Sequence, residues 1–225
     1  MWTLLSAGGW VMVPLLALSI VSLGIIAERY WALRRKSVLP AKLGDEVRAW
    51  VRTHKIEKEQ LRVLRENSPL GAVLAAVIAN KHRSRDIVRE KVEEVGRQQV
   101  HELGRFLNTL GTIAIISPLM GLLGTVFGLI RMFLVITSLG IGDANKLAGG
   151  IGEALVATAA GLVVAIISYM AHRALKGRIQ NFAVEMEREA ANLIDTFEHP
   201  EPHHVPASAP HAQSPRPAAP GGVRA

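Results

Sequence analysis

Three long runs without a charged side chain dominate the pattern of apolar and polar positions along the chain. These runs cover residues 1–27, 106–130 and 154–171. An α-helix rises about 1.5 Å per residue, so roughly 20 apolar residues cross a hydrocarbon core of about 30 Å. The pattern therefore predicts three transmembrane helices, near residues 8–29, 110–135 and 149–171.

Apolar residues at intervals of three and four continue outside two of these spans. The stripe before the second span comprises Val88, Val92, Val95, Leu103, Phe106 and Leu110. The stripe after the third comprises Ile179, Phe182, Met186, Ala190, Leu193 and Phe197. Such spacing buries one face of a helix, and helices of about 50 residues are about 75 Å long. We therefore expect an all-α membrane protein whose second and third helices extend into a cytoplasmic helical bundle. Shorter helices within 41–80, one of them at 67–80, are expected to join these two extensions in the bundle.

These patterns divide the chain into six segments. They are 1–36 with the first transmembrane helix, 37–105 as a cytoplasmic helical region, 106–136 with the second transmembrane helix, 137–148 as an external link, 149–197 with the third transmembrane helix and its cytoplasmic extension, and 198–225 as a tail. The tail is dominated by Pro, Ala and His, so it is expected to be disordered. Its histidines are candidates for weak metal binding, but a solvated tail is the favoured interpretation.

The distribution of charge predicts the orientation of the chain. Residues 29–105 carry 18 Lys and Arg against 10 Asp and Glu. In the 137–148 link the only charged residues are Asp143 and Lys146. Loops rich in Lys and Arg stay in the cytoplasm. We therefore expect a periplasmic N-terminus and a cytoplasmic C-terminus. The same asymmetry accounts for the net charge of +7 without nucleic-acid binding.

The candidate chemistry is concentrated in the third span. Glu153 directly precedes the apolar run at 154–171, and the next charged residue along the chain is Arg173. A charged side chain at the centre of a transmembrane helix costs about 2.5–3.5 kcal/mol on insertion scales, and less near the helix end. Glu153 is either an interfacial residue stabilised by the positive N-terminus of its helix, or an ionisable group that faces a polar cavity and relays protons. Thr125 and Thr158 would supply hydroxyl groups to such a pathway.

Small residues form a continuous helical face on both the second and the third span. In lipid, faces of this kind let two helices approach closely. The sequence therefore predicts helix packing through four glycines, namely Gly121, Gly124, Gly128 and Gly161. The first span carries bulky Leu, Ile and Val residues, which suit contact with membrane lipids.

Two segments carry a resemblance to a known family. They are "GLLGTVFGLI" at 121–130 and "GIGEALVATAAGLVVAI" at 150–166, in order and between matching spans. They resemble the two signature segments of the ExbB/TolQ/MotA family of proton-channel proteins. "ERYWALRR" at 28–35 is similar to the ExbB/TolQ type, and three spans fit that type better than the four-span MotA type.

The resemblance implies a proton-channel subunit of an energy-transducing motor complex in a bacterial inner membrane. Five copies would surround a dimer of a single-span partner resembling ExbD or TolR, whose span carries an Asp. The output would go to a TonB- or TolA-like protein acting on the outer membrane. In the family, the positions matching Thr125, Glu153 and Thr158 line the inside of the ring.

Three departures from the family pattern leave details open. The family usually has Pro at the position of Ile167, Tyr-Asn at His172-Arg173, and frequently His at Arg131. These differences leave the choice between ExbB and TolQ types, the energised process and the proton exit route undecided. His172 is a candidate for that exit.

The sequence is compatible with two other classes of function. A structural membrane scaffold, in which Glu153 does not conduct ions, is the main alternative. An enzyme is poorly supported because the sequence shows no nucleophile–base pair, no metal-ligand cluster and no phosphate-binding loop. The chain has no Cys, which excludes disulfides and thiolate metal sites. We expect no enzymatic activity, no metal and no cofactor.

Overall fold

The computed structural model describes residues 9–53, 58–139 and 144–198. Within these ranges every regular element is a helix, and three helices are long and apolar enough to cross a membrane. These findings confirm the predicted all-α membrane fold. The predicted tail after Glu198 and residues 140–143 of the predicted external link lie outside the described residues.

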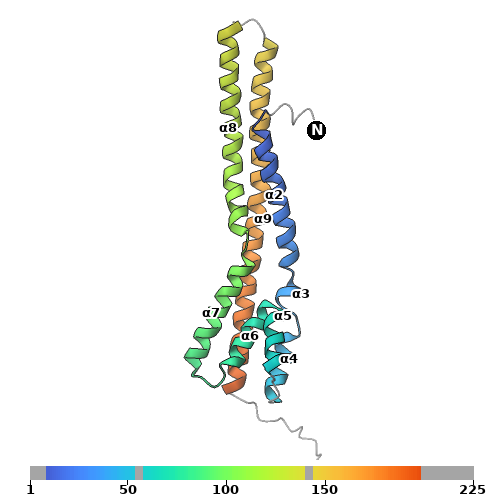
Figure 1. Ribbon diagram of the computed structural model, residues 1–225, viewed down its shortest axis with the longest axis vertical. Coiled ribbons are helices and arrows are strands. Elements are labelled where there is room, and N and C mark those ends of the chain that lie inside the picture. The colour runs from blue at the N-terminus through green and yellow to red at the C-terminus, as the bar shows by residue number, and fades with distance from the viewer. Residues whose placement is uncertain (1–8, 54–57, 140–143, 199–225) are drawn as a thin grey trace, which may run out of the picture.

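The membrane-spanning part consists of three helices. Helix α2 covers Met12–Ala32, α8 covers Leu107–Leu139, and α9 covers Ala144–Glu198. Helices α8 and α9 form an antiparallel hairpin, and α2 lies alongside its middle section, contacting both (Figure 1). The side chains of α2 that pack on the hairpin recur at helical spacing, namely Met12, Leu15, Ser22 and Arg29. Most of its remaining apolar side chains are exposed, as expected for a helix in contact with lipid.

Five shorter helices lie around the lower half of α9 (Figure 1). They are α3 (Arg35–Val38), α4 (Leu43–Arg52), α5 (Lys58–Asn67), α6 (Pro69–Ala79) and α7 (Arg85–Leu103). Helix α6 is apolar on nearly all sides and lies in the middle of this bundle, with most of its residues buried. Its start is set by Ser68, whose hydroxyl accepts a hydrogen bond from the backbone N–H of Gly71, and by Pro69 in the first turn.

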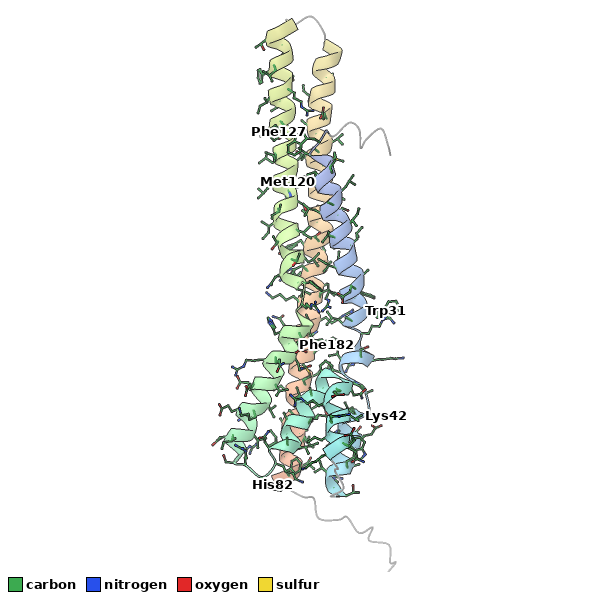
Figure 2. The ribbon with its side chains drawn as sticks, in the orientation of Figure 1. Trp31, Lys42, His82, Met120, Phe127 and Phe182 are labelled. Carbon is green, nitrogen blue, oxygen red and sulfur yellow. The ribbon has the colours of Figure 1, made fainter. Side chains whose placement is uncertain are left out.

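The predicted stripe on the lower part of α9 is confirmed. Ile179, Phe182, Met186, Ala190 and Leu193 are buried in one apolar cluster with α6 and neighbouring helices. Figure 2 shows Phe182 on α9 at the level where the short helices begin. Helix α9 is therefore one continuous helix of 55 residues that joins the membrane-spanning part to the bundle.

The prediction of a second unbroken helix of similar length is wrong. Helix α7 ends at Leu103 and α8 begins at Leu107, and between them Phe106 has a φ of 62°. This left-handed conformation is uncommon for a residue with a side chain, and it interrupts the helical hydrogen bonds. Arg29 of α2 donates to the Leu103 carbonyl at 3.4 Å, and the guanidinium groups of Arg29 and Arg105 both lie against the Phe106 ring. The break thus coincides with the point where α2 contacts the α7–α8 junction.

Candidate functional site

Exposed apolar side chains form a belt around the hairpin, and the length of this belt along the helices matches the thickness of the hydrocarbon core of a bilayer. On α8 exposed apolar side chains run from Ile115 to Leu134, and on α9 they run from Ile151 to Met170. Each range spans about 29 Å at 1.5 Å per residue, close to the hydrocarbon thickness of about 30 Å. On α9 the belt contains one charged residue, Glu153, near one end, and the first charged residue beyond its other end is Arg173.

Glu153 lies inside this belt, near the end where the hairpin turns. Exposed Ile151 and Leu155 flank it along α9. Helix α9 begins at Ala144, so Glu153 lies more than two turns into the helix. The stabilising effect of a helix N-terminus is confined to the first turn. The explanation of Glu153 as a residue held by the positive helix end is therefore not supported.

The carboxylate of Glu153 has a cationic partner on the neighbouring helix. Arg131 Nη1 of α8 lies 3.2 Å from Glu153 Oε1 and donates a hydrogen bond to it. The Glu153 side chain is 29% exposed and that of Arg131 is 56% exposed, so the pair lies at the surface of the hairpin. Pairing lowers the cost of holding a carboxylate in an apolar belt.

The residue just before α2, Gly9, also lies against the Glu153–Arg131 ion pair. Gly9, just before α2, has a φ of 66°, and a Cβ atom there would overlap Glu153 Oε1 and come close to the Arg131 guanidinium. The left-handed backbone favours glycine at position 9, and a larger residue would also make the Glu153 side chain move. The start of α2 thus lies directly against Glu153. In Figure 2 the nearby Phe127 appears at this level of α8.

The two threonines do not contact Glu153 within the chain. Thr158 Oγ1 donates to the Gly121 carbonyl of α8 at 3.0 Å, and Thr125 Oγ1 donates to the Leu122 carbonyl of its own helix at 2.7 Å. Thr158 follows Glu153 by five residues, which places the two side chains about 140° apart around α9. A single chain therefore does not bring Glu153, Thr125 and Thr158 together.

The four glycines lie at the contact between α8 and α9. A Cβ on Gly161 would lie 2.5 Å from the Ser117 carbonyl oxygen, and one on Gly121 would lie 3.0 Å from Thr158 Cα. Cβ atoms on Gly124 and Gly128 would meet the Cβ atoms of α9 alanines at 2.6 and 2.9 Å. The small-residue faces of the two spans therefore face each other within one chain.

Three polar features of the site were missed by sequence reasoning. The first is the pairing of Arg131 with Glu153, the second is the contact of Gly9, and the third is a buried hydrogen bond of 2.7 Å between Ser22 and Ser168. The first had a signal, because both charges stand eleven positions from residue 142, near the middle of the predicted link. In an antiparallel hairpin, positions equidistant from the turn lie at the same level.

Of the three departures from the family pattern, Arg131 lies beside Glu153, whereas Ile167 and His172-Arg173 lie toward the other end of the belt. Ile167 is exposed, and α9 continues through it without interruption. The His172 ring lies close to Gly111 of α8, where a Cβ atom would be 3.3 Å from Nε2. Among the residues that the structure describes, no group of three or more His, Cys, Asp or Glu is arranged to hold a metal ion.

Comparisons with known proteins identify the family that the chain resembles. The model of the MotA/TolQ/ExbB proton channel family matches residues 65–188. The "Putative biopolymer transport protein ExbB-like 1" of Synechocystis is 36% identical over 183 residues, covering 75% of this chain and 67% of the relative. The "Tol-Pal system protein TolQ" of Haemophilus influenzae is 35% identical over 100 residues, covering 44% and 42%. The "Biopolymer transport protein ExbB" of Salmonella typhimurium is 34% identical over 114 residues, covering 51% and 45%.

Proposed function

Because the chain belongs to the MotA/TolQ/ExbB proton channel family, as a multi-pass protein of the inner membrane, we propose that Glu153 is the proton-carrying group of an energy-transducing complex. The observation that carries this proposal is the position of Glu153. It is the only carboxylate between Ile151 and Met170 on α9, and α8 has none from Leu107 to Leu134. A carboxylate that is both inside the apolar belt and partly exposed is accessible to a proton donor beside the hairpin.

The chemistry of the pathway follows from the residue types. A carboxylate binds and releases a proton, and ionisable groups within membrane helices mark such relays. Hydroxyl groups both donate and accept hydrogen bonds, so Thr125 and Thr158 would pass a proton or hold a water molecule beside the carboxylate. Since one chain does not bring the three residues together, the pathway requires groups from neighbouring chains. The route by which the proton would leave, beyond the other end of the belt, is not assigned, and His172 is a candidate residue for it.

The proposed assembly is a ring of five copies around a dimer of a single-span partner. That partner would resemble ExbD or TolR, and its membrane Asp would exchange protons with Glu153. Proton flow would drive rotation or rearrangement of the partner, and the output would pass to a TonB- or TolA-like protein that acts on the outer membrane. The proposed orientation has a periplasmic N-terminus, an external 137–148 link and a cytoplasmic bundle, which agrees with the positive charge of residues 29–105. The chain itself would have no enzymatic activity.

The ion pair supports a second candidate function, a membrane scaffold. In that case Glu153 and Arg131 join α8 to α9, and neither carries a proton. The two candidates predict different outcomes for Glu153→Gln and Arg131→Gln, because each substitution removes the same ion pair but only the first removes the titratable carboxyl.

The experiment measures activity that depends on the proton-motive force, together with the abundance of the protein in the membrane. We expect Glu153→Gln to abolish activity at normal abundance, Glu153→Asp to retain part of it, and Arg131→Gln to retain more than Glu153→Gln. Thr158→Val should impair activity without unfolding the chain. If Glu153→Gln and Arg131→Gln lose activity equally and in proportion to abundance, the scaffold function is supported. Full activity of Glu153→Gln at normal abundance would also end the proton-carrier proposal.

A further inference from the structure

A basic cavity lies where α2 ends beside α9, outside the site described above. Its volume is about 680 Å³, within the range of small-ligand sites. The residues that line it come from the end of α2, the following turn and α9, and they are Tyr30, Leu33, Arg34, Arg35, Lys36, Arg178, Asn181, Phe182 and Glu185. Four of these side chains are cationic and one is anionic.

Three of the four cations remain available to a ligand. Arg35 Nη2 lies 2.7 Å from Glu185 Oε2, so this pair neutralises itself. In the part of the chain that the structure describes, no carboxylate pairs with Arg34, Lys36 or Arg178. The guanidinium groups of Arg34 and Arg178 instead lie against the Trp31 and Tyr30 rings, at 4.3 and 5.2 Å from the ring centroids. The cavity therefore has an excess of positive charge, and two of its guanidinium groups lie against aromatic rings.

The cavity lies at the border of the lipid headgroup layer. Arg178 lies eight residues, about 12 Å along α9, beyond Met170 at the end of the apolar belt. The headgroup layer outside the hydrocarbon core is about 5–8 Å thick on each side, so the Arg178 backbone lies just beyond this layer, and its long side chain brings the guanidinium group back against the Tyr30 ring. Tyr30 and Trp31 are 61% and 69% exposed, and Trp31 projects from the end of α2 away from the bundle (Figure 2). Exposed Tyr and Trp rings are typical of the membrane interface.

The chemistry of the lining favours a phosphate group attached to acyl chains. Guanidinium groups form paired hydrogen bonds with phosphate oxygens, and Lys adds a compact positive charge. Leu33 and Phe182 are buried and form an apolar wall, while the exposed Tyr30 ring leads from the cavity toward the apolar belt. Basic pockets beside transmembrane helices bind anionic headgroups.

We propose that this cavity binds the headgroup phosphate of an anionic phospholipid such as phosphatidylglycerol. The lipid bridges the end of α2 and the start of the cytoplasmic extension of α9. This binding does not depend on the role of Glu153 or on proton conduction.

The test uses the purified full chain in detergent micelles with equal amounts of phosphatidylglycerol and phosphatidylcholine. Native mass spectrometry measures which lipid stays bound. The wild-type chain should retain phosphatidylglycerol preferentially, and the double variant Arg34→Gln/Arg178→Gln should lower that preference by roughly tenfold. Arg34→Lys/Arg178→Lys should retain more of the preference than the Gln variant, because the charges remain although the paired guanidinium hydrogen bonds are lost.

The matched control removes two arginines from elsewhere on the surface. Arg62→Gln/Arg97→Gln eliminates the same charge, but these residues pair with Glu59 and Glu93 of their own helices at 3.1 and 3.3 Å. This control should leave the lipid preference unchanged within about twofold. An equal loss in the control, or an unchanged preference in the Arg34/Arg178 Gln variant with its helical content intact, would refute the site.

A second arm separates a lipid site from a site for free phosphate. Glycerol phosphate added in excess should not displace bound phosphatidylglycerol, because it lacks the acyl chains that lie against the belt. Displacement at comparable concentration would show that the cavity binds soluble phosphates, and the lipid proposal would then be wrong.

Discussion

Replacing Gly161 by Ala tests how closely α8 and α9 must approach each other. A Cβ at this position would lie 2.5 Å from the Ser117 carbonyl oxygen and 3.1 Å from Gly121 Cα, and both atoms belong to the backbone of α8. Ordinary contact begins at 3.4 Å, so the two helices must separate by about 0.9 Å. A flexible side chain cannot absorb this shift, because the obstructing atoms are backbone atoms.

The cost of this substitution has three parts. Overpacking of a close contact costs about 1–3 kcal/mol. Separation also weakens the hydrogen bond from Thr158 to the Gly121 carbonyl, and such bonds in membranes contribute about 0.6 kcal/mol. The higher helix propensity of Ala offsets about 0.5–1 kcal/mol. We therefore expect Gly161→Ala to destabilise the purified chain by about 1–3 kcal/mol.

The assay is reversible unfolding in mixed micelles with an increasing fraction of a denaturing detergent, followed by circular dichroism. Gly177 on the same helix and Gly24 on α2 provide matched controls. Apart from chain neighbours and the backbone of its own helix, no heavy atom lies within 4 Å of a Cβ at either position. Both alanine variants should be unchanged or more stable by up to about 1 kcal/mol. A Gly161→Ala variant as stable as Gly177→Ala would refute the close contact between α8 and α9.

Two further outcomes follow from the packing and the charge distribution. The buried hydrogen bond between Ser22 and Ser168 should appear as a coupling of about 0.6–1.7 kcal/mol in a double-mutant cycle of Ser22→Ala and Ser168→Ala, measured by the same unfolding assay. Additive effects would show that α2 does not depend on this bond. In intact spheroplasts, an impermeant thiol reagent should label Gly142→Cys and not Lys58→Cys. The reverse pattern would overturn the proposed orientation.

Much of the fold could be predicted because apolar spacing determines which helix faces are buried. The three apolar runs and the stripe from Ile179 to Leu193 correspond to helices or buried faces in the structure. The break between α7 and α8 could not be predicted in this way, since Phe106 continues the apolar spacing. The break coincides with a tertiary contact, the approach of Arg29 to the Leu103 carbonyl and the Phe106 ring, which the apolar spacing does not contain.

The candidate site shows a similar division. Glu153 stands out in the sequence because it is an isolated charge at an apolar run. Its contacts with Arg131 and Gly9 depend on how three helices meet, and Gly9 carries no chemical signal of its own. The sequence predicts that Thr158 shares a proton pathway with Glu153, and within the single chain the Thr158 hydroxyl donates to the Gly121 carbonyl. A role of the Thr158 hydroxyl in the proton pathway is therefore proposed only for the assembled complex.

The central claim is that Glu153 takes up a proton within the membrane. A hydrophobic carbodiimide reacts with protonated carboxyl groups in apolar surroundings, so it reports this state directly. The full chain is treated in native membranes at several pH values, and modified peptides are measured by mass spectrometry. Modification of Glu153 should increase as the pH falls and should be absent in Glu153→Gln. If Glu153 remains unmodified at every pH while other membrane carboxyl groups react, it does not take up a proton, and the proposed function is contradicted.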